Sequence, residues 1–129
     1  MPRAEVLTHK NARIVHIDLS KAALPQIVEA ITQSSLFIQG QPDNSVLCWV
    51  NTEGTVMTRE ISDALKMFTL KNKPYVKMTA ISGLTGVQKV VYSAILMFTK
   101  RDNLVLKNTR DEALDYLAAV AMQTAEAAI

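Results

Sequence analysis

The sequence predicts a single α/β domain with a mostly parallel sheet of four to five strands and four helices. Strand-like apolar segments alternate with amphipathic segments of helical length along all 129 residues. Residues 72–92 contain, in order, the signals of a helix end, a strand, a glycine turn and a helix start. No repeat or low-complexity linker divides the chain. Connections long enough to hold a helix make consecutive strands parallel.

The first third of the chain predicts a strand, a helix and a short hairpin arm. Residues 13–19 are rich in β-branched side chains, which favour a strand. Residues 5–8 could pair with this strand as an N-terminal arm. A helix is expected over residues 25–38, because Pro25 suits a first turn and Gly40 suits the position after a helix end.

The middle of the chain predicts a central strand followed by a second helix and a third strand. Residues 45–52 are apolar on both alternating faces, as is typical of a strand covered on both sides. Residues 58–71 have an apolar face at helical spacing. Asn72 is expected to end this helix as a left-handed cap, and Pro74 blocks its continuation. The next strand is expected over residues 75–81.

The last third predicts a turn, two further helices and a short strand between them. The turn is residues 82–86 (Ser-Gly-Leu-Thr-Gly), and the helix after it should run from 87 to about 100. Residues 104–107 predict a short strand near an edge. Thr109 and Glu112 have the spacing of a capping box, so the final helix should begin there.

Composition indicates a soluble cytoplasmic protein with a packed core. Hydrophobic residues make up 49% of the chain and charged residues 20%. The first thirteen residues lack the apolar run of a signal peptide. The most apolar predicted helix is shorter than the roughly 20 residues that span a bilayer. Cys48 is the only cysteine, so no intrachain disulfide can form, and its apolar strand predicts a buried, inert thiol.

The charge distribution is uneven although the net charge is only +2. Nine of the fourteen basic residues lie between Lys66 and Arg110, where Asp102 is the only acid. Such a segment could form one positive face that favours acidic partners or an anionic membrane surface. The alternative, which we favour at this point, is that these side chains are scattered in space and solvated.

Residues 72–77 (Asn-Lys-Pro-Tyr-Val-Lys) resemble bacterial STAS-like, or SpoIIAA-like, proteins, and the resemblance extends over most of the chain. Its other marks are residues 17–19 (Ile-Asp-Leu), 41–42 (Gln-Pro), 51–55 (Asn-Thr-Glu-Gly-Thr), 82–86 and 109–115 (Thr-Arg-Asp-Glu-Ala-Leu-Asp). These are turn and packing signatures and include no catalytic motif.

The resemblance implies a SpoIIAA-like β/α superhelix related in fold to CRAL-TRIO lipid-carrier domains. It also implies non-enzymatic roles without a cofactor, namely regulatory protein contacts or association with lipid and membrane. Anti-sigma-factor antagonists of this fold have an Asp-Ser-Ser-Gly phosphorylation turn. The comparable residues 51–55 lack the serine pair, which argues against a partner switch of that kind.

A candidate ligand site lies beyond the carboxyl ends of the predicted strands, where open parallel sheets bind ligands. Residues 82–86 open a helix whose free N–H groups could bind phosphate or carboxylate. The candidate residues are Asn51, Thr52, Ser82, Gly83, Thr85, Gly86 and Lys89. The alternative, which we favour, is that the glycines and threonines only build tight turns, because the pattern matches no phosphate-binding motif.

His16 and Asp18 lie two apart on one strand and so share a face, where they could act as an acid–base pair. The sequence places no serine or cysteine nucleophile beside them, so we expect a packed, hydrogen-bonded His16. The histidines and Cys48 do not have metal-ligand spacing, and no metal site is expected.

A candidate interaction surface combines basic residues with the outer face of the helix predicted over 87–100. Apolar groups flanked by lysine can insert at a membrane interface or contact a partner. The candidate residues are Lys73, Lys77, Tyr92, Leu96, Lys100 and Arg101. The alternative, which we hold equal, is that another layer such as the last helix covers Tyr92 and Leu96.

Three functional hypotheses follow from these features. The first is a non-catalytic STAS-like module that binds a protein partner, an anionic lipid surface or a small apolar ligand, in the cytoplasm or peripherally at the membrane. The second is a nucleotide or small-molecule binder, or an enzyme, that uses residues 82–86. The third is a structural homodimer. Nucleic-acid binding is not expected, because aromatic residues are only 5% and do not interleave with the basic ones.

Overall fold

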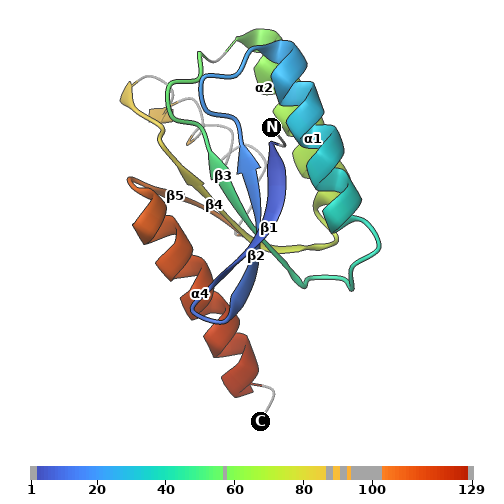
Figure 1. Cartoon of the computed structure of the whole chain (residues 1–129), viewed down its shortest axis with the longest axis vertical. Coiled ribbons are helices and arrows are strands. Elements are labelled where there is room, and N and C mark those ends of the chain that lie inside the picture. The colour runs from blue at the N-terminus through green and yellow to red at the C-terminus, as the bar shows by residue number, and fades with distance from the viewer. Residues whose placement is uncertain (1–2, 57, 87–88, 91–92, 94–102, 128–129) are drawn as a thin grey trace.

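The computed structural model describes the backbone of residues 3–56, 58–86, 89–90, 93 and 103–127, and side chains as far as residue 123. A five-stranded mixed sheet lies at the centre, with helices on both of its faces (Figure 1). Two helices pack side by side on one face, and the C-terminal helix crosses the other. The predicted α/β class and mostly parallel sheet are confirmed.

The chain begins with an antiparallel hairpin made of β1 (Ala4–His9) and β2 (Ala12–Asp18). The two turn residues, Lys10 and Asn11, have φ values of 47° and 68°. Positive φ at both central residues is the geometry of a type I′ turn, whose twist matches that of the paired strands. The hairpin arm expected from the sequence is therefore confirmed.

The remaining strands are parallel to β2 and follow it across the sheet in chain order. They are β3 (Val46–Asn51), β4 (Val76–Ser82) and β5 (Leu104–Lys107). The pairs β2–β3, β3–β4 and β4–β5 are all parallel. This order places the carboxyl ends of four neighbouring strands along one edge of the sheet.

Two helices cover the first face of the sheet: α1 (Leu24–Ile38) and α2 (Arg59–Asn72). The other face is covered by α4 (Arg110–Ala127). Thr109 precedes α4, and its Oγ1 accepts a hydrogen bond from the N–H of Glu112 at 3.2 Å, as the predicted cap requires.

The fourth predicted helix, over residues 87–100, lies mostly outside the described residues. The described backbone at positions 86, 89, 90 and 93 is helical. These positions belong to the connection between β4 and β5.

Alternation along the central strands divides the core into two apolar clusters. Val15 and Cys48 face α1 and α2 with Ile27, which is 0% exposed. Ile14 and Leu47 face α4 on the opposite side. A strand with apolar residues on both faces is thus covered on both, as predicted for residues 45–52, and the thiol of Cys48 is buried as expected.

The expectation that Asn72 is a left-handed cap is wrong. Asn72 is the last residue of α2, and the cap residue Lys73 has right-handed φ and ψ values of −49° and −44°. Asn72 is only 2% exposed, and its Nδ2 donates to the carbonyl of Phe68 at 3.0 Å. The N–H of Tyr75 donates to the carbonyl of Asn72 at 3.1 Å, so this end of the helix satisfies one of its free carbonyls without a left-handed residue.

Candidate functional site

Two loops that the sequence placed at the carboxyl edge, residues 51–55 and 82–86, are pressed against each other. The N–H and the Oγ1 of Thr52 both donate to the carbonyl of Ser82, at 2.9 and 2.8 Å. Gly83 has a φ of 89°, and a Cβ added to it would lie 2.6 Å from the backbone nitrogen of Glu53. Only glycine fits this close approach.

The polar side chains at this junction are engaged within the protein. Thr52 is 0% exposed and Ser82 is 3% exposed. The Oγ of Ser82 accepts a hydrogen bond from Trp49 Nε1 at 2.8 Å. The Oδ1 of Asn51 accepts from the N–H of Glu53 at 3.1 Å. The hydrogen bonds between Thr52 and Ser82 therefore join the two loops, whereas that of Asn51 is internal to the first loop.

The other candidate residues of this site lie nearer the solvent. Thr85 and Gly86 are exposed and Gly83 is half-buried. The exposed Lys89 side chain donates from Nζ to Oδ1 of Asn108 at 3.3 Å. Of the seven candidates, only Thr52 and Ser82 are thus buried, and the other five are half-buried or exposed.

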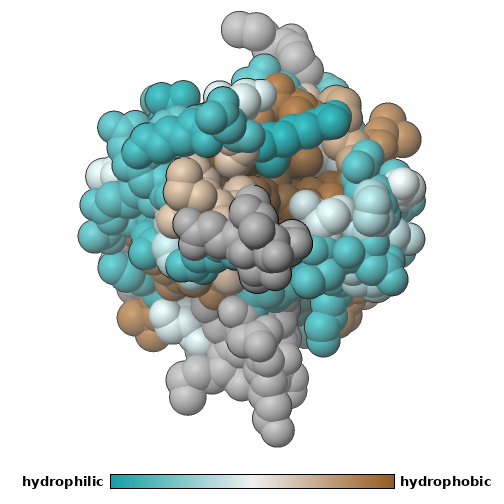
Figure 2. Space-filling view, turned by 90° about the horizontal axis from the view of Figure 1, so that it is seen from below, coloured by the Kyte–Doolittle hydropathy of each residue, from teal (hydrophilic) through white to brown (hydrophobic). Residues whose placement is uncertain are grey.

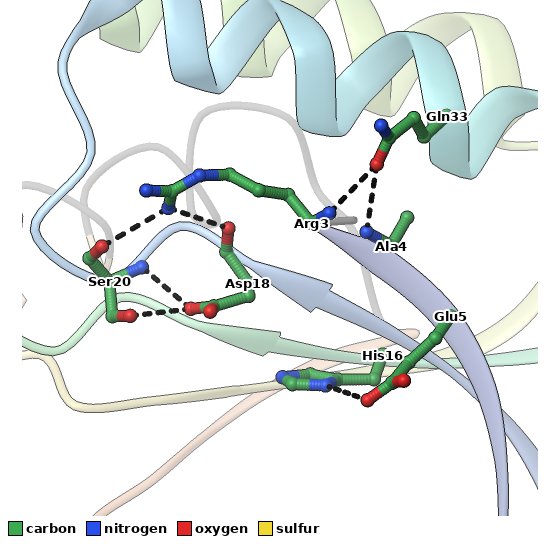
Figure 3. A network of polar contacts seen from close by, with 7 residues as sticks. All are labelled: Arg3, Ala4, Glu5, His16, Asp18, Ser20 and Gln33. Atoms are coloured by element: carbon green, nitrogen blue, oxygen red, sulfur yellow. Dashed lines mark hydrogen bonds and ion pairs between the residues drawn. The ribbon is translucent and has the colours of Figure 1, made fainter. Parts of the chain in front are cut away.

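His16 is packed against Trp49, with ring centroids 4.0 Å apart and planes inclined by 12°. The guanidinium of Arg110 lies 5.5 Å from the centroid of the Trp49 ring. Nδ1 of His16 lies 3.5 Å from a carboxylate oxygen of Glu5, whereas Nε2 is buried without a hydrogen-bond partner (Figure 3). A stacked histidine of this kind agrees with the packing role expected for it.

Asp18 and His16 have different partners, although they share a strand face. The Oδ1 of Asp18 accepts from the N–H and the Oγ of Ser20, at 3.0 and 2.5 Å. The Arg3 guanidinium donates to the carbonyls of Asp18 and Ser20. The N–H groups of Arg3 and Ala4 donate to Oε1 of Gln33, so that α1 is tied to the start of β1 (Figure 3).

The basic residues between Lys66 and Arg110 are divided between opposite edges of the sheet. Lys73 and Lys77 lie where α2 leads into β4, at the amino ends of the parallel strands. Lys107 ends β5 and Arg110 begins α4, at the carboxyl ends. Of the candidate interaction residues, Tyr92, Leu96, Lys100 and Arg101 lie outside the described residues.

An apolar surface that was not predicted from the sequence lies on the outside of α1 and α2. Leu36 is 79% exposed, Leu70 is 61% exposed and Met67 is 57% exposed. Each lies on the side of its helix away from the buried stripe, a position that a helical projection of the sequence would have revealed. Apolar residues also reach the surface on the underside of the molecule, where Figure 2 shows them in a hollow among hydrophilic residues.

Charge is polarised along these two helices. All of their acidic side chains lie in the first half of each helix: Glu29, Glu60 and Asp63. The second half of α2 has Lys66 and Lys71 and no acid, and the second half of α1 has no charge. We call this end of the layer the basic apolar end; it consists of Leu36, Lys66, Met67, Leu70, Lys71 and Lys73.

Other kinds of site find no support in the part of the chain that the structure describes. No three His, Cys, Asp or Glu side chains gather there as metal ligands. None of the helices described has the length and hydropathy needed to cross a membrane. No family model, curated protein or solved structure matched this chain.

Proposed function

We propose that this protein is a non-catalytic STAS-like binding module that attaches to an anionic membrane surface through its basic apolar end. The observation behind this proposal is that one end of α1 and α2 combines exposed apolar side chains with three lysines. The carboxylates of both helices lie in their first halves, and Asp43 is exposed in the loop after α1. The proposal includes the four-helix β/α superhelix that the STAS-like resemblance implies, and a cytoplasmic protein that is peripheral to the membrane. It requires no cofactor.

The apolar part of the surface supplies the insertion energy. Leu36 and Leu70 are both more than half exposed, so each has most of its side-chain surface still to bury. Full burial of such a side chain contributes about 1.5–3 kcal/mol. Two helices that present these groups side by side can enter the boundary between headgroups and acyl chains, as amphipathic helices do.

The basic part of the surface supplies selectivity for anionic lipid. Lys66, Lys71 and Lys73 are all exposed. Each lysine close to an anionic leaflet contributes roughly 1 kcal/mol. The acidic residues of the two helices lie in their first halves, so a molecule tilted onto the basic apolar end keeps them away from the bilayer.

A liposome sedimentation assay tests the proposal with matched variants. Vesicles with anionic lipid should bind the protein, and neutral vesicles should bind it far less. Replacing all three lysines by glutamine should weaken binding to anionic vesicles about a hundredfold. Arg59→Gln is the charge control, because Arg59 lies in the first turn of the same helix.

The apolar contribution has its own control pair. Leu70→Ser should weaken binding about tenfold or more. Met122→Ser should leave it unchanged, because Met122 is equally exposed, at 62% against 61%, but lies on α4. Absence of binding, or equal binding to neutral and anionic vesicles, would refute membrane attachment and leave a protein partner as the occupant of this end.

A nucleotide or small-molecule site at residues 82–86 has less support, because Thr52 and Ser82 are engaged in holding the loops together. Thermal shift with nucleotides and phosphorylated metabolites tests it, since a bound ligand must raise stability. Light scattering tests the homodimer.

A further inference from the structure

The outer side of β1 is an open sheet edge over part of its length. β1 lies at one end of the strand order, next to β2. The N–H of Asp18 donates to the carbonyl of Arg3 at 2.8 Å, so from Arg3 onward every second residue exchanges hydrogen bonds with β2. The backbone groups of Ala4, Val6 and Thr8 therefore point away from the sheet.

Two of these three residues have backbone groups that nothing in the described part of the chain satisfies. The N–H of Ala4 donates to Oε1 of Gln33 at 3.1 Å, which closes the beginning of the edge (Figure 3). No described group hydrogen bonds to the N–H of Val6 or of Thr8. Val6 is half-buried and Thr8 is exposed. Free backbone groups at a sheet edge are a template for another strand.

We propose that β1 pairs with β1 of a second copy of this chain, so that the two sheets join edge to edge in a two-fold dimer. A two-fold axis that relates two identical edge strands makes them antiparallel. Val6 of each copy then exchanges backbone hydrogen bonds with Thr8 of the other. This inference is independent of membrane attachment, because β1 takes no part in the basic apolar end.

The free groups permit only one register. Pairing Val6 with Thr8 puts the two-fold axis at Leu7. An axis at Val6 would pair Ala4 with Thr8, but the N–H of Ala4 is already bonded to α1. An axis at Thr8 would pair Val6 with Lys10, which lies in the hairpin turn with a φ of 47°.

The charges of β1 are complementary to those of a second β1 in this register. Glu5 of one copy lies opposite His9 of the other and beside its Lys10, because positions 5 and 9 are equally far from the axis. Glu5 is exposed, and the side chain of Lys10 is 63% exposed. Opposite charges that face each other across antiparallel strands stabilise a sheet. The two-fold axis repeats the pair, and this match selects a second copy over an unrelated extended peptide.

An exposed aromatic side chain lies on the side of α1 that is nearest this edge. Gln33 accepts hydrogen bonds from the N–H groups of Arg3 and Ala4, so its side of α1 faces the start of β1 (Figure 3). Phe37 is one turn further along that side and is 39% exposed. A two-fold axis perpendicular to the joined sheet puts both α1 helices on the same face, where the second copy covers Phe37.

The first test uses the unaltered protein at a series of concentrations. Analytical ultracentrifugation should show a monomer that converts to a dimer as concentration rises. Over the same range the hydrogen exchange of the Val6 and Thr8 amides should slow about tenfold or more, because only the monomer exposes them. The amide of Ala4 is the control, since it is hydrogen-bonded within each copy and should change little.

A cysteine pair tests the register. Leu7→Cys should form a disulfide-linked dimer on mild oxidation, because Cα atoms directly opposite at a non-hydrogen-bonded position are about 4.5 Å apart, within the range of a disulfide. Glu5→Cys is the control: it is more exposed, but its two copies are four residues apart along the joined strands, about 13 Å. Glu5→Cys should therefore remain unlinked.

A proline variant tests the hydrogen bonds. Thr8→Pro removes the outward N–H while leaving the pairing of β1 with β2 in place, since edge strands tolerate proline where the N–H faces solvent. Thr8→Ala keeps the N–H. Thr8→Pro should weaken dimerisation about tenfold or more, and Thr8→Ala should dimerise like the wild type.

Four results would each overturn the proposal: a monomer at every concentration, a dimer in which the Val6 and Thr8 amides exchange as fast as in the monomer, equal cross-linking of Leu7→Cys and Glu5→Cys, or undiminished dimerisation of Thr8→Pro. The exchange measurement needs no variant, so it decides the matter even if a substituted chain fails to fold. Liposome binding can succeed or fail separately, because it is read with variants of α2.

Discussion

Replacing Gly83 by alanine should destabilise the protein more than the same change at Gly40. The two glycines have almost the same φ, 89° and 93°. A Cβ at Gly40 would meet no atom within 4 Å, whereas a Cβ at Gly83 would lie 2.6 Å from the nitrogen and 2.9 Å from the Cα of Glu53. Both variants have the cost of a positive φ, but only Gly83→Ala also has the clash with the loop of residues 51–55. The difference between their free energies of unfolding therefore measures that clash.

The expected magnitudes follow from these two contributions. An L-residue in the left-handed region costs roughly 1–2 kcal/mol, and this cost applies to both positions. Forcing a methyl group into a packed contact costs about 1–3 kcal/mol more when the neighbour cannot rotate away. Glu53 meets the new group with backbone atoms, so Gly83→Ala should lose about 2–5 kcal/mol and Gly40→Ala about 1–2 kcal/mol.

Urea denaturation followed by the fluorescence of Trp49 measures the difference. Trp49 is the only tryptophan and is 3% exposed, so unfolding changes its environment strongly. If the free energies of unfolding of the two variants agree within about 0.5 kcal/mol, the loops do not press on each other as described, and the reasoning fails.

Two further predictions concern contacts of α4 and of β3. Trp49→Phe removes the donor to Ser82 Oγ and should lower the free energy of unfolding by about 1–3 kcal/mol, measured by circular dichroism; a loss under about 0.5 kcal/mol would contradict the hydrogen bond. Hydrogen bonds from His9, and then from Lys10, lower the pKa of Asp115 below its ordinary 3.8. Because the pKa of this carboxyl is lower in the folded state, its charge stabilises the fold above pH 3.8, and this stabilisation is lost as pH falls through the folded-state pKa. The free energy of unfolding of Asp115→Asn should therefore change less with pH below about pH 4 than that of the wild type. An NMR titration midpoint for Asp115 at or above 3.8 would refute this.

Most elements of the fold could be predicted because local and long-range preferences agree in this chain. The apolar run expected over residues 45–52 became β3, since a strand that is apolar on both faces is stable only between two covering layers. The cap at Thr109 depends on residues three positions apart and was predictable for that reason.

The candidate site was less predictable, because its key contacts join distant parts of the chain. Sequence shows that Thr52 and Ser82 follow strands, but only the sheet register shows that Thr52 donates to the Ser82 carbonyl. Helical periodicity places Leu36 and Leu70 away from the core, yet it does not say whether another layer covers them. The conformation of Asn72 was predicted wrongly because its carbonyl is satisfied by the N–H of Tyr75, a contact that composition and spacing do not reveal.

The strands take their places in the sheet in the order in which they are synthesised. Each new strand can therefore pair with an edge that already exists, beginning from the hairpin of β1 and β2, whose contacts are local. The last 18-residue helix is different, because α4 covers Ile14 and Leu47, which leave the ribosome much earlier. Until α4 is made, Ile14 and Leu47 lack the helix that covers them among the described residues, so nascent chains should engage chaperones until the final helix docks.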